Sequence, residues 1–98
     1  MVNTARAARP PASTSQRRPP SLRELEVLQA MIATRKTVAA AQRLGISQPA
    51  VSRALAALEA HVGRPLFARE GGRLVPTADA FALEAEAQPI FTALDRLN

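Results

Sequence analysis

Hydrophobic residues recur at helical spacing directly after a pair of capping residues near the start of the chain. Leu22, Leu25, Leu28 and Ile32 follow one another at intervals of three or four, and with Val27 and Met31 they form one broad apolar face of a helix. Ser21 with Glu24 three residues later has the pattern of a capping box. We therefore predict a helix from Leu22 to about Thr34.

A second, shorter helix is predicted from Thr37, as its N-cap, to Leu44. Its inward face should carry Val38, Ala41 and Leu44, and its several alanines allow a neighbouring helix to approach closely. Gly45 follows the last residue and can adopt the left-handed conformation that ends a helix.

A third helix should begin with Ser47 as N-cap and end near His61 or Val62. Pro49 then lies in the first turn, where backbone N–H groups have no partner inside the helix and a missing one costs little. The expected buried stripe is Val51, Leu55, Leu58 and Val62. Two helices joined by a glycine-containing turn form a helix-turn-helix, here at about residues 37–56, whose second helix enters the DNA major groove.

After Gly63 the hydrophobic pattern changes from helical to strand-like. Residues 65–69 and 73–76 form two short runs separated by Glu70, Gly71 and Gly72, which predicts a β-hairpin, or wing.

Thr77 should cap a last helix in residues 78–98. Pro89 lies inside it and, at a cost of about 3 kcal/mol, predicts a kink or two shorter helices. The predicted fold is mainly α: a winged helix-turn-helix of three helices and a hairpin wing in residues 21–77, followed by a linker helix.

Composition narrows the function further. The chain of 98 residues has no cysteine, one histidine and no phosphate-binding glycine loop, so we expect neither an enzyme nor a metal or cofactor site. No apolar run reaches the ~20 residues of a membrane span. Residues 1–20 hold four arginines, four prolines and no acid, and we expect this tail to be disordered.

Charge and side-chain type on the third helix favour nucleic acid as the partner. The net charge is +5, and no acid occurs between Val27 and Leu58. The helix face opposite the buried stripe carries Gln48, Pro49, Ser52, Arg53 and Ala56. Gln can pair with adenine, Arg with guanine or phosphate, and a proline ring can contact a thymine methyl group. The competing interpretations are an exposed face of an ordinary helical bundle, or a small dimerisation module whose helix-turn-helix only packs.

The segment TVAAAQRLGISQPAVSRALAALEAHVGRPLFAREGGRLVPT resembles the N-terminal domain of LysR-type transcriptional regulators. The similarity covers roughly residues 22–80. It is carried by the AA-x-x-L before the turn, by SQPAVSR in residues 47–53, by Leu58-Glu59, Gly63 and LF-x-R in residues 66–69, and by Thr77.

The resemblance implies a winged helix-turn-helix that binds double-stranded promoter DNA through the third helix and the wing. The residues expected to contact DNA are Thr37, Ser47, Gln48, Pro49, Ser52, Arg53, Arg69 and Arg73. It also implies that the linker helix pairs with a second subunit, and the expected dimerisation residues are Phe81, Ala85, Phe91 and Leu94.

The chain departs from the family pattern at several positions. It has Leu28 where Phe is usual, Lys36-Thr37 in place of Gly-Ser before the second helix, and Ala80 in place of Gly. Family members also carry a C-terminal sensor domain for a small-molecule effector. This chain is then either the excised DNA-binding part of a longer protein, which we expect, or a natural protein that lacks the sensor. The expected protein is cytoplasmic, a homodimer in this part and a tetramer at full length, without membrane attachment.

Overall fold

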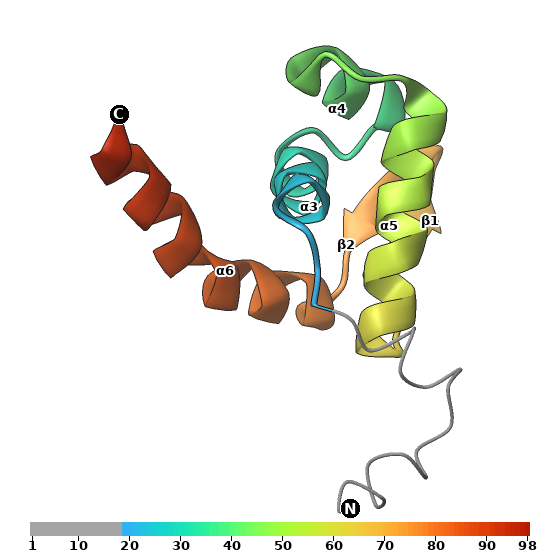
Figure 1. The fold of residues 1–98 in the computed structure, drawn as a ribbon. Helices are drawn as coiled ribbons and strands as arrows, with labels where there is room; N and C mark the ends of the chain where they lie inside the picture. The colour runs from blue at the N-terminus through green and yellow to red at the C-terminus, as the bar shows by residue number, and fades with distance from the viewer. Residues whose placement is uncertain (1–18) are drawn as a thin grey trace, which may run out of the picture.

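The computed structural model describes residues 19–98, so the predicted disordered tail lies almost wholly outside the described part. The described part is mainly helical with one two-stranded antiparallel sheet, as predicted (Figure 1). Its elements are α3 (Leu22–Thr34), α4 (Thr37–Leu44), α5 (Gln48–Val62), β1 (Phe67–Glu70), β2 (Arg73–Pro76) and α6 (Ala78–Leu97). In this part no helix is both long and apolar enough to cross a membrane.

Three of the four predicted helix starts carry the expected side-chain cap. Ser21 Oγ accepts from the Glu24 backbone N–H at 3.0 Å, and the Glu24 carboxylate accepts from the Ser21 N–H at 3.1 Å. Ser47 caps α5 and Thr77 caps α6 in the same way, by accepting from the backbone N–H three residues later. These bonds satisfy N–H groups that the helix itself leaves without partners.

The start of α4 differs from the prediction by one residue. Its N-cap is Lys36, which makes no side-chain capping bond, and Thr37 is the first helical residue. Arg35 precedes it in the left-handed region, with φ 62°. A glycine suits such a left-handed position and a serine suits the N-cap after it, whereas this chain has Arg35 and Lys36 there. The prediction of Thr37 as the N-cap was therefore one residue late.

The inward face of α4 was also predicted wrongly in part. Ala41 is buried and Leu44 half-buried, but Val38 is 48% exposed and Ala40 is fully buried in its place. Successive helical residues are about 100° apart, so Val38 lies to one side of the face that Ala41 and Leu44 share.

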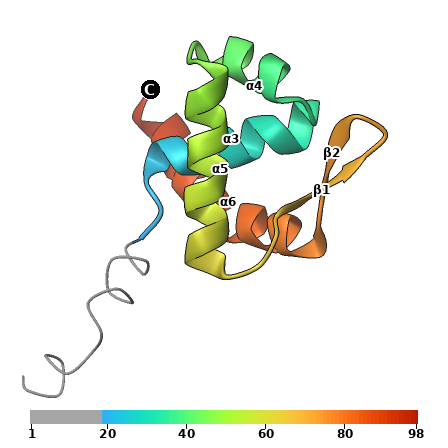
Figure 2. The ribbon, with the colours of Figure 1, turned by 90° about the vertical axis from the view of Figure 1, so that its right-hand side faces the viewer.

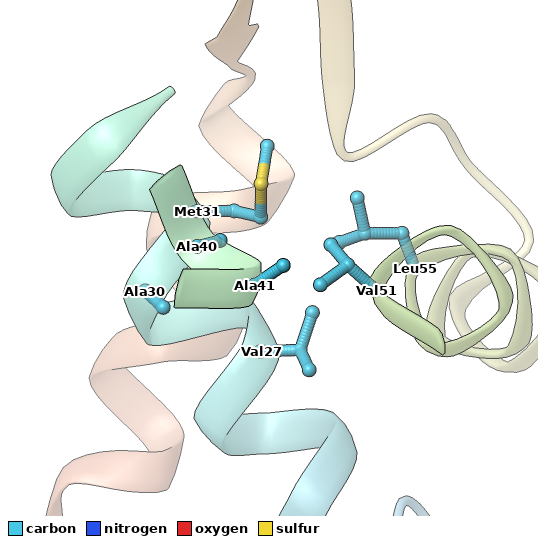
Figure 3. Close-up of a cluster of buried hydrophobic side chains, with 7 residues drawn as sticks. All are labelled: Val27, Ala30, Met31, Ala40, Ala41, Val51 and Leu55. Carbon is cyan, nitrogen blue, oxygen red and sulfur yellow. The ribbon is translucent and has the colours of Figure 1, made fainter. Parts of the chain in front are cut away.

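One half of the core joins the three helices of the helix-turn-helix region. Figure 3 shows its side chains from α3, α4 and α5 pointing toward one another. The members are Val27, Ala30, Met31, Ala40, Ala41, Val51 and Leu55. The alanines let α4 pack closely on α3 and α5, and this packing fixes which side of α5 remains exposed.

The other half of the core holds α6 and the wing against α3 and α5. Its buried members are Leu25, Leu28, Leu58, Leu66, Ala80 and Ala87. α6 is one helix through Pro89, and its axis changes direction along its length in Figure 1. The predicted interruption is therefore a bend and not a break. The cause is that proline has no N–H to donate to the preceding turn and its ring crowds that turn.

The wing is a hairpin with a two-residue turn. Glu70 pairs with Arg73 in the ladder, which leaves Gly71 and Gly72 as the turn, one residue fewer than predicted. Their φ values of 56° and 78° are what a type I′ turn requires, and glycine adopts them without strain. The hairpin tip lies beside the turn between α3 and α4 (Figure 2), where the Leu74 N–H donates to the Arg35 carbonyl at 3.0 Å.

Candidate nucleic-acid interface

The first two turns of α5 present the polar face that the sequence predicted. Gln48, Pro49, Ser52 and Arg53 are all exposed, as is Ala56 one turn further along. Val51 is buried on the opposite side of the same helix with Leu55 and Leu58. The core therefore holds α5 from one side and leaves an unobstructed row of polar groups at its N-terminal end.

The start of α5 is fixed by its cap and by α4. The Ser47 hydroxyl oxygen accepts the Ala50 N–H at 3.2 Å, and its own proton can still be donated outward. The Thr37 hydroxyl donates to Gln48 Oε1 at 3.5 Å. Thr37 was predicted as a helix cap, but the structure places it against the side chain of Gln48. This contact is long for an O–H···O bond, so the NH₂ group of Gln48 can still donate to a base and its Oε1 can still accept.

A shallow hollow with three cationic side chains lies between the hairpin tip and the turn that joins α3 to α4. Its lining residues are Arg35, Lys36, Thr37, Val38, Arg69, Gly72 and Leu74. Arg35 is half-buried, whereas Lys36 and Arg69 are exposed. No acid lines the hollow.

Arg35 and Lys36 were not among the site residues predicted from the sequence. The helical pattern placed both in a connecting turn, where two adjacent basic residues could be no more than solvated surface. Their proximity to the wing depends on the fold and has no sequence pattern.

The two wing arginines lie in different surroundings, although the sequence grouped them. Arg69 pairs with Leu74 in the ladder and lines the hollow. Arg73 pairs with Glu70, so the carboxylate is its directly opposite neighbour on the same face of the hairpin. Arg69 therefore belongs to an acid-free surface, and Arg73 does not.

The base of the wing is tied to α5 by Glu59, a residue that the sequence reasoning gave no structural role. Glu59 Oε2 accepts from the Leu66 N–H at 2.8 Å. The Leu66 carbonyl in turn accepts from the Thr77 N–H at 2.9 Å, and the Thr77 hydroxyl donates to the Pro65 carbonyl at 2.9 Å. These three bonds set the direction in which the hairpin leaves α5.

Apart from Glu70 on the wing, two acidic side chains pair with arginines elsewhere on the domain. Glu26 pairs with Arg23 at 3.3 Å, and Asp79 pairs with Arg64 at 3.8 Å. Within residues 19–98, no cluster of three or more His, Asp or Glu could hold a metal ion. His61 is exposed near the end of α5.

The predicted dimerisation residues do not share one exposed face of α6. Phe81 is 47% exposed and Ala85 is exposed, but Phe91 is half-buried against the core of its own domain. Phe91 therefore packs partly on its own domain, and its pairing with a second chain stays a prediction. A second apolar row, spaced alternately by four and three residues, is Leu83, Ala87, Ile90, Leu94 and Leu97. In this row Ile90 and Leu97 are 45% and 81% exposed.

Comparison with known proteins places the chain in a family. A family model described as bacterial regulatory helix-turn-helix protein, lysR family, matches residues 22–80. The transcriptional activator protein LysR of Escherichia coli is 40% identical over 77 residues, which are 79% of this chain and 25% of that protein. Nodulation protein D 1 of Rhizobium meliloti is 46% identical over 59 residues, 60% of this chain and 19% of that protein. The chain thus spans about a fifth to a quarter of the length of these relatives.

Solved structures agree with this assignment. A crystal structure of a CbnR DNA-binding domain in complex with DNA superposes with a TM-score of 0.71 at 33% identity, covering 78% of this chain and 87% of that one. OxyR of Corynebacterium glutamicum in its oxidized form gives a TM-score of 0.75 at 29% identity, covering 82% of this chain and 24% of that one.

Proposed function

Because the chain belongs to the lysR family of bacterial regulatory helix-turn-helix proteins, we propose that it binds double-stranded promoter DNA as the DNA-binding part of a transcriptional regulator. The observation that carries the proposal is the exposed polar face at the start of α5, which lies in a part of the chain without acids from Val27 to Leu58. A polyanion can approach this surface without repulsion, and a helix N-terminus fits the major groove.

Each residue of this face has a role that follows from its chemistry. Gln48 reads a base edge with its amide group, which lies beside the Thr37 hydroxyl. Pro49 contacts a thymine methyl group, and Ser52 bonds a base edge or a phosphate. Arg53, one turn further from the helix start, pairs with guanine or with the backbone.

The wing and the cap supply contacts that position the domain. Arg69 and Arg73 reach the phosphates flanking the groove, with Arg69 contributing more because Arg73 lies opposite Glu70. The Ser47 hydroxyl, which already accepts a backbone N–H, donates its proton to a phosphate.

Dimerisation would place two such domains on two half-sites of the operator. The exposed apolar side chains near the end of α6, Ile90 and Leu97, and Phe81 near its start support pairing with a second copy. Leu94, Ala85 and the exposed part of Phe91 would complete the contact. We place the protein in the cytoplasm, where promoter DNA is. A small-molecule effector would act through a sensor domain outside these residues.

The direct test is to select a cognate site from genomic fragments and then titrate it and random DNA by fluorescence anisotropy at several salt concentrations. We expect tight binding to the selected site and weaker binding to random DNA, with log K falling linearly as log salt rises. Sedimentation of the free protein should show self-association. Self-association without any salt-sensitive DNA binding would mean instead that the domain is a dimerisation module.

A further inference from the structure

We propose that the hollow lined by Arg35, Lys36 and Arg69 binds one backbone phosphate of the DNA. This inference rests on the proposed DNA-binding function and adds a phosphate site that lies outside α5. Two of the three cations come from the turn before α4, and the third comes from the wing.

The wing and the turn between α3 and α4 form one site because a backbone hydrogen bond joins them. The Leu74 N–H donates to the Arg35 carbonyl at 3.0 Å, and Leu74 is the ladder partner of Arg69. Opposite residues of an antiparallel pair place their side chains on the same face, so Arg69 shares a face with Leu74, and both line the hollow. The position of this cation relative to Arg35 is therefore set by the fold.

The local backbone favours residues other than the two cations that stand there. Arg35 has φ 62°, a conformation that glycine adopts without steric cost and that strains other residues. Lys36 is an N-cap without a side-chain bond, where serine would accept a backbone N–H. Some support comes from the Thr34 hydroxyl, which accepts from the Lys36 N–H at 3.4 Å. Two successive residues thus give up stability and add two positive charges.

Phosphate is the ligand that this chemistry fits. Arg35 and Arg69 can each present a planar guanidinium, which forms paired hydrogen bonds to phosphate oxygens, and Lys36 adds a mobile point charge. No acid lines the hollow to compete for these groups. The hollow also includes Thr37, whose hydroxyl lies beside the Gln48 side chain, so a phosphate bound here would lie near the first turn of α5.

The test is the double variant Arg35→Gly/Lys36→Ser, which restores the residues that the backbone prefers. We expect its thermal unfolding midpoint to rise by several degrees. We expect the magnitude of its log K against log salt slope to fall by about 0.9, the loss of one phosphate contact. Affinity should fall roughly tenfold on cognate and random DNA alike, because a phosphate contact carries no sequence information.

A matched control removes two positive charges elsewhere. Arg23→Gln/Arg96→Gln has the same change in net charge, and neither residue lines the hollow. Its slope should stay close to that of the wild type. Suppose that Arg35→Gly/Lys36→Ser is more stable than the wild type but has the same slope of log K against log salt as the control. This result would overturn the phosphate site even though the wild type binds DNA. A wild type without DNA binding would overturn the proposed function as well, so the two failures are distinguishable.

Discussion

The two helices of the helix-turn-helix begin in similar ways but with opposite residue choices. α5 follows the turn Gly45-Ile46, with Gly45 left-handed at φ 69°, and its N-cap Ser47 accepts the Ala50 N–H. α4 follows Arg35, left-handed at φ 62°, and its N-cap Lys36 makes none. The start of α5 has the residues that stabilise a helix, whereas the start of α4 has two cations where such residues would fit.

This difference fits two functions of the proposed DNA-binding surface, reading bases at the α5 start and neutralising phosphate at the α4 start. A side chain that reads bases must be held at a fixed place. The Ser47 cap holds the first turn of α5, and the Thr37 hydroxyl lies beside the Gln48 side chain. A side chain that neutralises a phosphate needs charge more than fixed geometry, so a less stable turn can serve. Under our proposals, the α5 start contributes sequence specificity and the α4 start contributes affinity.

The largest effect should come from the reading residue itself. We predict that Gln48→Ala costs about 1–3 kcal/mol of binding free energy on the cognate site and little on random DNA. Arg53→Ala should weaken binding to both. Anisotropy titrations on the two DNAs measure this, with circular dichroism as the folding control, since both residues are exposed. Equal losses on both DNAs for Gln48→Ala would show that it positions the helix and does not read sequence.

The next largest effect should come from the two wing arginines. Arg69→Ala should cost about 1.5 kcal/mol of binding free energy, because it removes a charged contact from an acid-free surface. The magnitude of the slope of log K against log salt should fall by about 0.9. Arg73→Ala should cost less, because Glu70 lies opposite it. Salt titrations of each single variant on random DNA provide the measurement. Equal slopes for the two variants would contradict a separate role for the hollow.

The starts of α5 and α4 can be compared directly through the free energy of unfolding. Ser47→Ala should lower the free energy of unfolding by about 1 kcal/mol, because an N–H group of the first turn loses its acceptor. Lys36→Ala should change it by less than about 0.5 kcal/mol, since no capping bond is lost. Urea denaturation followed by circular dichroism distinguishes them. A comparable loss for Lys36→Ala would mean that the α4 start has support beyond its cap.

The smallest effect should come from the contact between the two helix starts. Thr37→Val keeps the size of the side chain and removes the hydroxyl that lies beside Gln48 Oε1. We expect a loss of about 0.5–1 kcal/mol on cognate DNA and none on random DNA. In the double variant Thr37→Val/Gln48→Ala the two losses should be less than additive. Full additivity would show that Thr37 acts independently of Gln48.

Much of this molecule follows from the sequence because its determinants are local. A capping serine or threonine acts on an N–H group three residues away, as at Ser21, Ser47 and Thr77. A buried stripe is visible in the spacing of residues on one helix, so Val51, Leu55 and Leu58 could be assigned to the core and Gln48 and Arg53 to the surface. The sequence by itself therefore determined the helices, the hairpin and the exposed face of α5.

Only the tertiary structure decided which groups meet across these elements. Arg35 bonds to Leu74, Thr37 to Gln48 and Glu59 to Leu66, and the half-buried Phe91 packs on its own domain. No spacing along one element encodes such a pair, because it depends on how closely and in which direction two elements pack. For this reason the sequence could not predict the cationic hollow or the different surroundings of Arg69 and Arg73. It could predict the capped start of α5.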